Sequence, residues 1–358
     1  MQAKRWTAVA AGVLVVTSAA LSAEKGRDDA DEPRIKPAIR GLVSMGAFKF
    51  VGSGGDPVNT LEPIKAKAGI FGGLVVVASW MQLQPEGPDD FDSRVIDDAM
   101  KEVRGYNAEH KDKPLSVRLR IWGGFKAPPW VLKLGGPPIK AVHKNKNRRL
   151  GRFWSPEYRK AWANLQEKLA ERYDSWPLIR EVSMTSCMSF TAEPFYSPNE
   201  DAVQEPIREA GFNEKVYKDC LKHGLDDYGA WKFTRIVLSV NPLRTRPDQG
   251  PGDPDFTMEI MRDCRKRLGV RCVFDNHNLD TKYPRPLRPL YALMKELGPE
   301  IAFQTGGTNP DDFDGTIKLG VEMGATSIEL WQDYRGFPTV PDKDLKRWAK
   351  MIEANDSP

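Results

Sequence analysis

Short runs of apolar and β-branched residues alternate with longer amphipathic segments along most of this chain. Runs of this kind predict buried strands, and apolar residues spaced three and four apart between them predict helices. There are eight such runs, at residues 41–50, 72–80, 115–122, 179–188, 233–240, 271–278, 300–307 and 325–332.

Helical periodicity fills several of the gaps between these runs. Three sets of apolar residues each share one helix face: Ile96, Ala99, Met100 and Val103; Trp162, Leu165 and Leu169; and Leu345, Trp348, Ala349 and Ile352. Parallel strands need crossovers of this length, and eight βα units close a barrel. The prediction is an α/β fold, a (β/α)8 TIM barrel. An open doubly wound sheet is the alternative, but no glycine-rich phosphate loop follows the first strand to favour it.

The first residues have the pattern of an export signal. Lys4 and Arg5 precede an apolar run over 7–16, and small residues follow. We expect a signal peptide at 1–23, a flexible leader at 24–38 and one barrel domain at 39–356, in a protein secreted to the extracellular space or periplasm. A membrane anchor is the alternative, but the apolar run is shorter than the about 20 residues that span a bilayer.

Composition narrows the class of partner. The chain has 358 residues, 40% of them hydrophobic and 28% charged, with a net charge of +4. Acidic and basic residues are interleaved, so nucleic acid is not the expected partner. The run KAVHKNKNRR at 140–149 is the exception. It is typical of a solvated surface loop, and a subsite for an anionic polymer is the alternative.

Cysteines add one open question. Cys187, Cys220, Cys264 and Cys272 lack the CxxC spacing of a metal finger. An exported protein can form disulfides. Three pairings are possible, and buried free thiols are the alternative.

Barrels of this kind carry their chemistry at the carboxyl ends of the strands. These ends are unusually polar and aromatic here. The candidate residues are Trp80, Gln82, Arg120, Trp122, Trp130, Glu193, Asn241, Asp275, His277, Gln304, Glu329 and Trp331.

Glu329 is unusual because it lies within an otherwise apolar strand. Strand side chains alternate, so Glu329 shares the interior face with Ser327 and Trp331, while Ile328 and Leu330 face the helices. A carboxylate inside a barrel loses its hydration, so it is expected there only if it has a specific role. Catalysis is one such role, and a buried ion pair with Arg118 or Arg120 is the alternative.

Two carboxylic acids facing a tryptophan-rich cleft are what cleavage of a glycosidic bond requires. One protonates the departing oxygen, and the other attacks the anomeric carbon or activates water. Tryptophan faces suit the apolar C–H surfaces of sugars. The pattern therefore predicts a carbohydrate substrate, with Glu193 and Glu329 as the carboxylates and no cofactor or metal.

Three segments resemble the clan-A glycoside hydrolases, the cellulase- and β-galactosidase-like (β/α)8 enzymes. They are SWMQLQPEGPDDFDSRVIDDAM around the second strand, LRIWGGFKAPPWV at the third, and TAEP after the fourth. The resemblance implies that Glu193 is the general acid/base, since TAEP stands where those enzymes carry Asn-Glu-Pro.

The chain departs from that clan at two positions. Ala192 replaces the Asn that precedes the acid/base, and Gln304 stands where the nucleophilic Glu ends the seventh strand. An amide cannot be that nucleophile. Three explanations are open: Glu329, or next Asp275, supplies the second carboxylate; SIELWQ is the seventh strand; or catalysis has been lost in a secreted carbohydrate-binding barrel.

A metal-dependent sugar-processing barrel is the competing enzyme class. Glu193, Asp275, His277 and Glu329 could be oxygen and nitrogen ligands at successive strand ends. The chain has only four histidines, which counts against this alternative.

Overall fold

The computed structural model describes residues 34–355, except 46, 51–56, 144–145, 196–200, 284, 307–311 and 332–336. Residues 35–358 form one compact unit. The predicted signal peptide and most of the predicted leader lie outside the described residues. No described helix combines the length and the apolar character that a membrane crossing requires.

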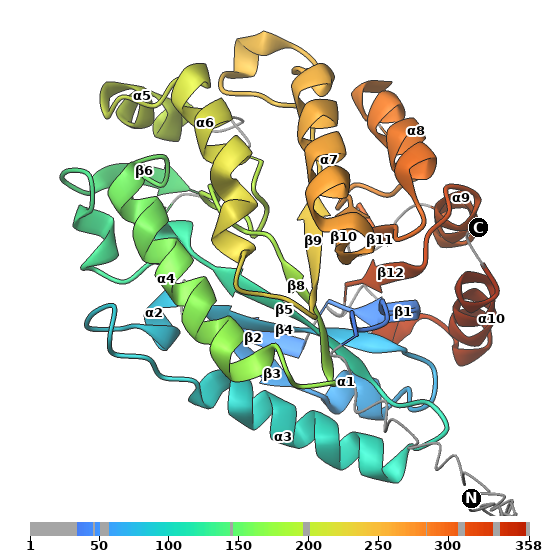
Figure 1. The fold of residues 1–358 in the computed structure, drawn as a ribbon. Coiled ribbons are helices and arrows are strands. Elements are labelled where there is room, and N and C mark those ends of the chain that lie inside the picture. The colour runs from blue at the N-terminus through green and yellow to red at the C-terminus, as the bar shows by residue number, and fades with distance from the viewer. Residues whose placement is uncertain are drawn as a thin grey trace, which may run out of the picture. The chain divides into compact units, whose positions relative to one another are not determined.

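Eight parallel strands form the centre of this unit (Figure 1). The strands are β1 (Gly41–Ser44), β4 (Gly73–Ser79), β5 (Ser116–Trp122), β8 (Ile179–Ser183), β9 (Arg235–Ser239), β10 (Cys272–Asp275), β11 (Ala302–Gln304) and β12 (Ser327–Leu330). Neighbouring strands follow the order β10-β9-β8-β5-β4-β1-β12-β11. Bridges from Phe274 to Ile301 and from Leu279 to Thr305 bring the two ends of this order together.

Each strand lies inside one of the eight runs found in the sequence, so the predicted (β/α)8 barrel is confirmed. The strand that contains Glu329 is the eighth and pairs with the first. The alternative in which SIELWQ forms the seventh strand is therefore wrong, and Gln304 does end the seventh strand.

Helices surround the strands (Figure 1). The three predicted helix faces are buried on α3 (Arg94–Glu109), α4 (Pro156–Tyr173) and α10 (Asp342–Glu353). Side chains cap helix starts as propensity predicts: Ser155 accepts from the backbone N–H of Tyr158, and Asn213 from that of Val216. The remaining helices are α1 (Glu62–Lys65), α2 (Trp80–Leu83), α5 (Asp201–Glu209), α6 (Glu214–Gly224), α7 (Pro254–Leu268), α8 (Arg288–Leu297) and α9 (Phe313–Glu322).

Two antiparallel hairpins interrupt the alternation of strand and helix. Strands β2 (Ala47–Phe50) and β3 (Pro57–Thr60) lie between β1 and β4 along the chain and pair with each other. Strands β6 (Ile139–His143) and β7 (Lys146–Leu150) pair in the long connection between β5 and α4. The second hairpin contains the basic run of the sequence.

The barrel domain begins earlier than the sequence predicted. Lys36 is buried, and its ammonium donates to the carbonyl oxygen of Ile179 and the hydroxyl of Thr234, each at 2.7 Å. Burial lowers the pKa of Lys36 to about 8. Ile39 packs inside the barrel against Val43 and Val75. The prediction of a flexible leader up to residue 38 is thus corrected, because the segment from Lys36 onward packs against the starts of β8 and β9.

All four cysteines are paired. Cys187 binds Cys220, which joins the loop after β8 to α6, and Cys264 binds Cys272, which joins α7 to the start of β10. The sequence left three pairings and free thiols open, and the structure has the pairing of Cys187 with Cys220 and of Cys264 with Cys272.

Candidate active site

Glu193 lies in the loop after β8, at the carboxyl end of the barrel strands. Its side chain is 18% exposed. Oε1 lies 3.0 Å from Nδ1 of His277, and Oε2 accepts a hydrogen bond of 2.9 Å from the side-chain amide of Asn241. The residues that the sequence placed after the fourth, fifth and sixth strands therefore meet at one point.

His277 connects Glu193 to a second carboxylate. Its Nε2 lies 2.9 Å from Oδ2 of Asp275, the last residue of β10. Burial on its own would lower the pKa of His277, but the carboxylates of Glu193 and Asp275 raise it to about 10. The imidazole is therefore a cation at neutral pH, held between two carboxylates.

Asp275 is held as an anion deep in the barrel. Burial alone would raise the pKa of its carboxyl, but the cations His277 and Arg118 lower it to about 2. Nη1 of Arg118 lies 3.6 Å from Oδ2 of Asp275. Asp275 is 1% exposed, so its predicted contact with substrate is corrected to a contact with His277.

Arg118 is the hub of a buried ionic cluster within the barrel. It donates to Glu181 at 2.8 Å and to Glu329 at 3.4 Å, in addition to its approach to Asp275. These three carboxylates raise the pKa of Arg118 above its ordinary value despite the opposing effect of burial. Glu181 also accepts from the backbone N–H of Ile39, which ties the barrel's first residues to the cluster.

Glu329 is fully buried and both of its oxygens are bound to Arg120. The guanidinium donates through Nη1 to Oε1 and through Nη2 to Oε2, each at 2.8 Å. This is the ion pair that the sequence allowed as the alternative role of Glu329. The interior face predicted for this residue is confirmed, and the substrate contact predicted for Arg120 is corrected, because Arg120 is 3% exposed and bound to Glu329.

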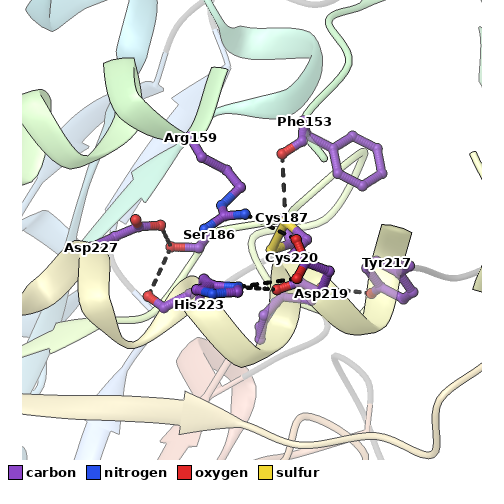
Figure 2. Close-up of a disulfide and its surroundings, with 11 residues drawn as sticks. Phe153, Arg159, Ser186, Cys187, Tyr217, Asp219, Cys220, His223 and Asp227 are labelled. Atoms are coloured by element: carbon purple, nitrogen blue, oxygen red, sulfur yellow. Dashed lines mark hydrogen bonds and ion pairs between the residues drawn. A yellow bond between two sulfur atoms is a disulfide. The ribbon is translucent and has the colours of Figure 1, made fainter. Parts of the chain in front are cut away.

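The loop that presents Glu193 is attached to α6 through the disulfide between Cys187 and Cys220, which Figure 2 shows. The Cys187–Cys220 disulfide precedes Glu193 in the loop, and the hydroxyl of Tyr217 donates to the carbonyl oxygen of Pro194 at 2.7 Å. Ser186 donates to Asp227 at 2.8 Å, and burial raises the pKa of that carboxyl to about 7.

The same loop also packs against the connection after β5. The backbone N–H of Phe125 donates to the carbonyl oxygen of Ser189. A Cβ atom at Gly124 would lie 1.9 Å from that same oxygen, and Gly124 has a positive φ of 55°. Only glycine fits this close approach.

The predicted tryptophans divide into two groups. Trp122, Trp130 and Trp331 are half-buried, so part of each ring is open to solvent. Trp331 donates to the carbonyl oxygen of Thr305, and Trp130 to that of Gln84. Trp80 is 0% exposed and packs edge to face against Trp130, Tyr158 and Trp162. The prediction that Trp80 lines a sugar subsite is corrected, since its ring belongs to the core between barrel and helices.

The two glutamines predicted to contact substrate, Gln82 and Gln304, lie at the ends of a helix and a strand. Gln82 is half-buried and forms a capping box with Ser79 at the start of α2. Gln304 ends β11 beside Glu329 in the sheet register and is 5% exposed. Sequence reasoning missed Glu181, although the signal that identified Glu329, a carboxylate inside an apolar strand, also applies to it.

The metal alternative finds no ligand cluster in the described part of the chain, where no three His, Cys, Asp or Glu side chains are grouped so as to hold an ion. Both ring nitrogens of His277 face carboxylates. Neither is therefore free to bind a metal in this arrangement.

Comparisons with known proteins yield structural likeness alone. No family model and no curated protein matches the sequence. Among solved structures, the catalytic domain of beta-amylase from Paenibacillus polymyxa is 10% identical, with a TM-score of 0.54 over 86% of this chain and 97% of that one. Endo-glycoceramidase II from Rhodococcus sp. is 16% identical, with a TM-score of 0.51 over 89% and 80%. XacCel5A is 12% identical, with a TM-score of 0.51 over 88% and 99%. At these identities the likeness shows that the fold is shared.

Proposed function

We propose that this protein is a glycoside hydrolase that cleaves an oligosaccharide or polysaccharide, with Glu193 as its acid/base. The observation that carries the proposal is the position of Glu193, a partly exposed carboxylate held by Asn241 and His277 after the fourth barrel strand. The shared fold with a beta-amylase and an endo-glycoceramidase supports it. Trp122, Trp130 and Trp331 offer partly open rings for sugar faces.

In this mechanism the Glu193 carboxylate takes up a proton when the substrate covers it and excludes water, and it then protonates the departing glycosidic oxygen. The carboxylate that remains faces the His277 imidazolium, which stabilises the negative charge as it forms. Asp275 holds the imidazole from the opposite side and so acts on Glu193 through His277. Asp275 and His277 are therefore positioning residues, because each acts through Glu193 and not on the sugar.

Glu329 has a structural role in this proposal. Glu329 is fully buried with both oxygens bound to Arg120, so it does not reach the sugar or its attacking water. Gln304 cannot form a covalent glycosyl ester through its amide, so bond cleavage proceeds without a covalent intermediate on the seventh strand. Water adds to the anomeric carbon as the glycosidic bond breaks, and its proton passes to the Glu193 carboxylate, which restores the acid.

We also propose that the enzyme acts after export. The cationic and apolar pattern of the first residues supports an exported protein. Two disulfides among four cysteines support an oxidising compartment.

A panel of aryl glycosides and defined oligosaccharides tests the activity, with release of reducing ends as the readout. Wild-type protein should cleave at least one member, and Glu193→Gln should cleave it about 10²–10⁴-fold more slowly. Glu167→Gln, an exposed change on α4, is the matched control and should retain full activity.

Carbohydrate binding without turnover is the second candidate function, and Gln304 at the end of the seventh strand favours it. It predicts that wild-type protein binds an oligosaccharide by calorimetry and returns it uncleaved. Cleavage of that ligand, lost in Glu193→Gln, would exclude this candidate.

A further inference from the structure

A cationic hairpin lies in the connection that follows β5. Strands β6 and β7 span residues 139–150, a stretch that contains Lys140, Lys144, Lys146, Arg148 and Arg149 and has no Asp or Glu in its sequence. Of the described residues in this hairpin, no basic side chain forms an ion pair with a described acidic partner.

The hairpin has one face toward the protein and one toward solvent. Ile139, Ala141 and Leu150 are buried on the inner face. The outer face carries four exposed residues, Lys140, Val142, Asn147 and Arg149. The alternation matches a strand pair with one side packed against the protein.

The register of the hairpin places like charges opposite each other. Lys140 pairs directly with Arg149, and Val142 with Asn147. Like charges at directly opposed positions destabilise a strand pair. An anion bound between Lys140 and Arg149 would remove this repulsion.

The hairpin also forms a hollow of about 420 Å³, lined by Lys140, Ala141, Val142, Asn147, Arg148 and Arg149. Val142 is 38% exposed there, which is unusual for a large apolar side chain. Cations beside an amide and an apolar surface suit a sugar ring that carries an anionic group, because such a ring has C–H faces, hydroxyls and a charge.

Packing contacts beneath the hairpin connect its inner face to the loop that carries Glu193. Arg148 pairs with Ala141 on that inner face, and its guanidinium lies 5.0 Å from the centre of the Phe125 ring. Phe125 stacks on Phe190 at 6.0 Å and meets Trp122 edge to face at 6.2 Å. Phe190 belongs to the same loop as Glu193, so contacts run from the hairpin to that loop.

We propose that the outer face of the β6–β7 hairpin binds the carboxylate or sulfate groups of an acidic polysaccharide that is cleaved at Glu193. The inference rests on the proposed glycosidase function and gives it a substrate class. The exposed Val142 beside the cations favours a sugar chain over a nucleic acid.

Calorimetry tests the inference with full-length protein and four probes: an oligogalacturonate, a sulfated chondroitin oligosaccharide, a neutral cello-oligosaccharide and single-stranded DNA of matched charge. Lys140→Gln/Arg149→Gln is compared with wild type. Lys111→Gln/Arg262→Gln, which removes the same charge from two exposed positions elsewhere, is the control. Chromatography of each probe afterwards reports cleavage separately from binding.

The expected result is that one acidic oligosaccharide binds wild type and loses about tenfold in affinity in the hairpin variant, but not in the control. Which acidic probe binds distinguishes carboxylate from sulfate. Equal losses in both variants, unchanged binding in the hairpin variant, or DNA binding as tight as the sugar would overturn the inference. A bound acidic probe that is never cleaved would count against the glycosidase proposal and leave the subsite standing.

Discussion

Nδ1 of His277 lies 3.0 Å from Oε1 of Glu193, while Nε2 of the same ring lies 2.9 Å from Asp275. Neither ring nitrogen is therefore open to a substrate. His277 is placed to hold Glu193 and to balance its charge, and Arg118 continues the same line of contacts to Glu181 and Glu329.

His277 should make stability depend on pH. Its pKa is raised from an ordinary 6.5 to about 10, so the protonated ring stabilises the folded state fully below pH 6.5. This contribution is lost as pH rises from 6.5 to about 10. Urea unfolding of wild type and His277→Gln should show a difference in free energy of unfolding that is largest near pH 6 and shrinks by pH 10. A difference that is constant with pH would contradict a charged His277.

Glu329→Gln should lower the free energy of unfolding. The change leaves Arg120 without its bidentate partner in the barrel interior, and breaking a buried pair costs roughly 3–5 kcal/mol. Replacing both Arg120 and Glu329 by Met should cost less stability, since no unpaired charge of this pair remains. Chemical denaturation of the three proteins measures this order. A Glu329→Gln protein with native stability and no activity would restore the catalytic role of Glu329.

Loss of the Cys187–Cys220 disulfide should loosen the loop that presents Glu193. Cys187→Ser/Cys220→Ser is expected to lower the free energy of unfolding by about 2–4 kcal/mol and to lower kcat. Cys264→Ser/Cys272→Ser removes the disulfide at the start of β10 and should lower stability with a smaller effect on kcat. Equal losses of kcat would argue against a specific role of the first disulfide.

Trp80 and Trp122 should respond differently to truncation. Trp80→Ala removes a fully buried ring and should cost roughly 3–5 kcal/mol of stability. Trp122→Ala should keep most of the stability and raise KM, because part of that ring is open to solvent. Thermal unfolding and steady-state kinetics on the two variants separate the effects. A normal KM in a folded Trp122→Ala protein would remove Trp122 from the proposed subsites.

The sequence predicted the fold well because a parallel barrel repeats one signal eight times. Every strand lies within its predicted run, and the interior position of Glu329 followed from alternation alone. The start of the domain was missed because Lys36 and its neighbours look like a polar leader. Their burial depends on carbonyl groups at the distant starts of β8 and β9.

The site was predicted less completely, because the partners of a charge are not visible in one sequence. Strand ends indicated that Glu193, Asn241 and His277 are near one another, and they are. The roles of the other predicted residues depend on how deeply each side chain is buried, which the sequence does not show. Trp80 stands at a strand end like Trp122, but the turn of α2 directs its ring into the core. Glu329 could not be separated from a catalytic carboxylate until its bidentate contact with Arg120 was known.

The most direct test of the central claim compares the turnover of Glu193→Gln, Glu329→Gln and wild type on the best glycoside of the panel, with folding checked by circular dichroism. We predict that Glu193→Gln loses about 10²–10⁴-fold in kcat. Folded Glu329→Gln should retain turnover within about tenfold of wild type, because a buried ion pair positions groups without touching the sugar. A Glu193→Gln protein that turns over like wild type would contradict the assignment of Glu193 as acid/base.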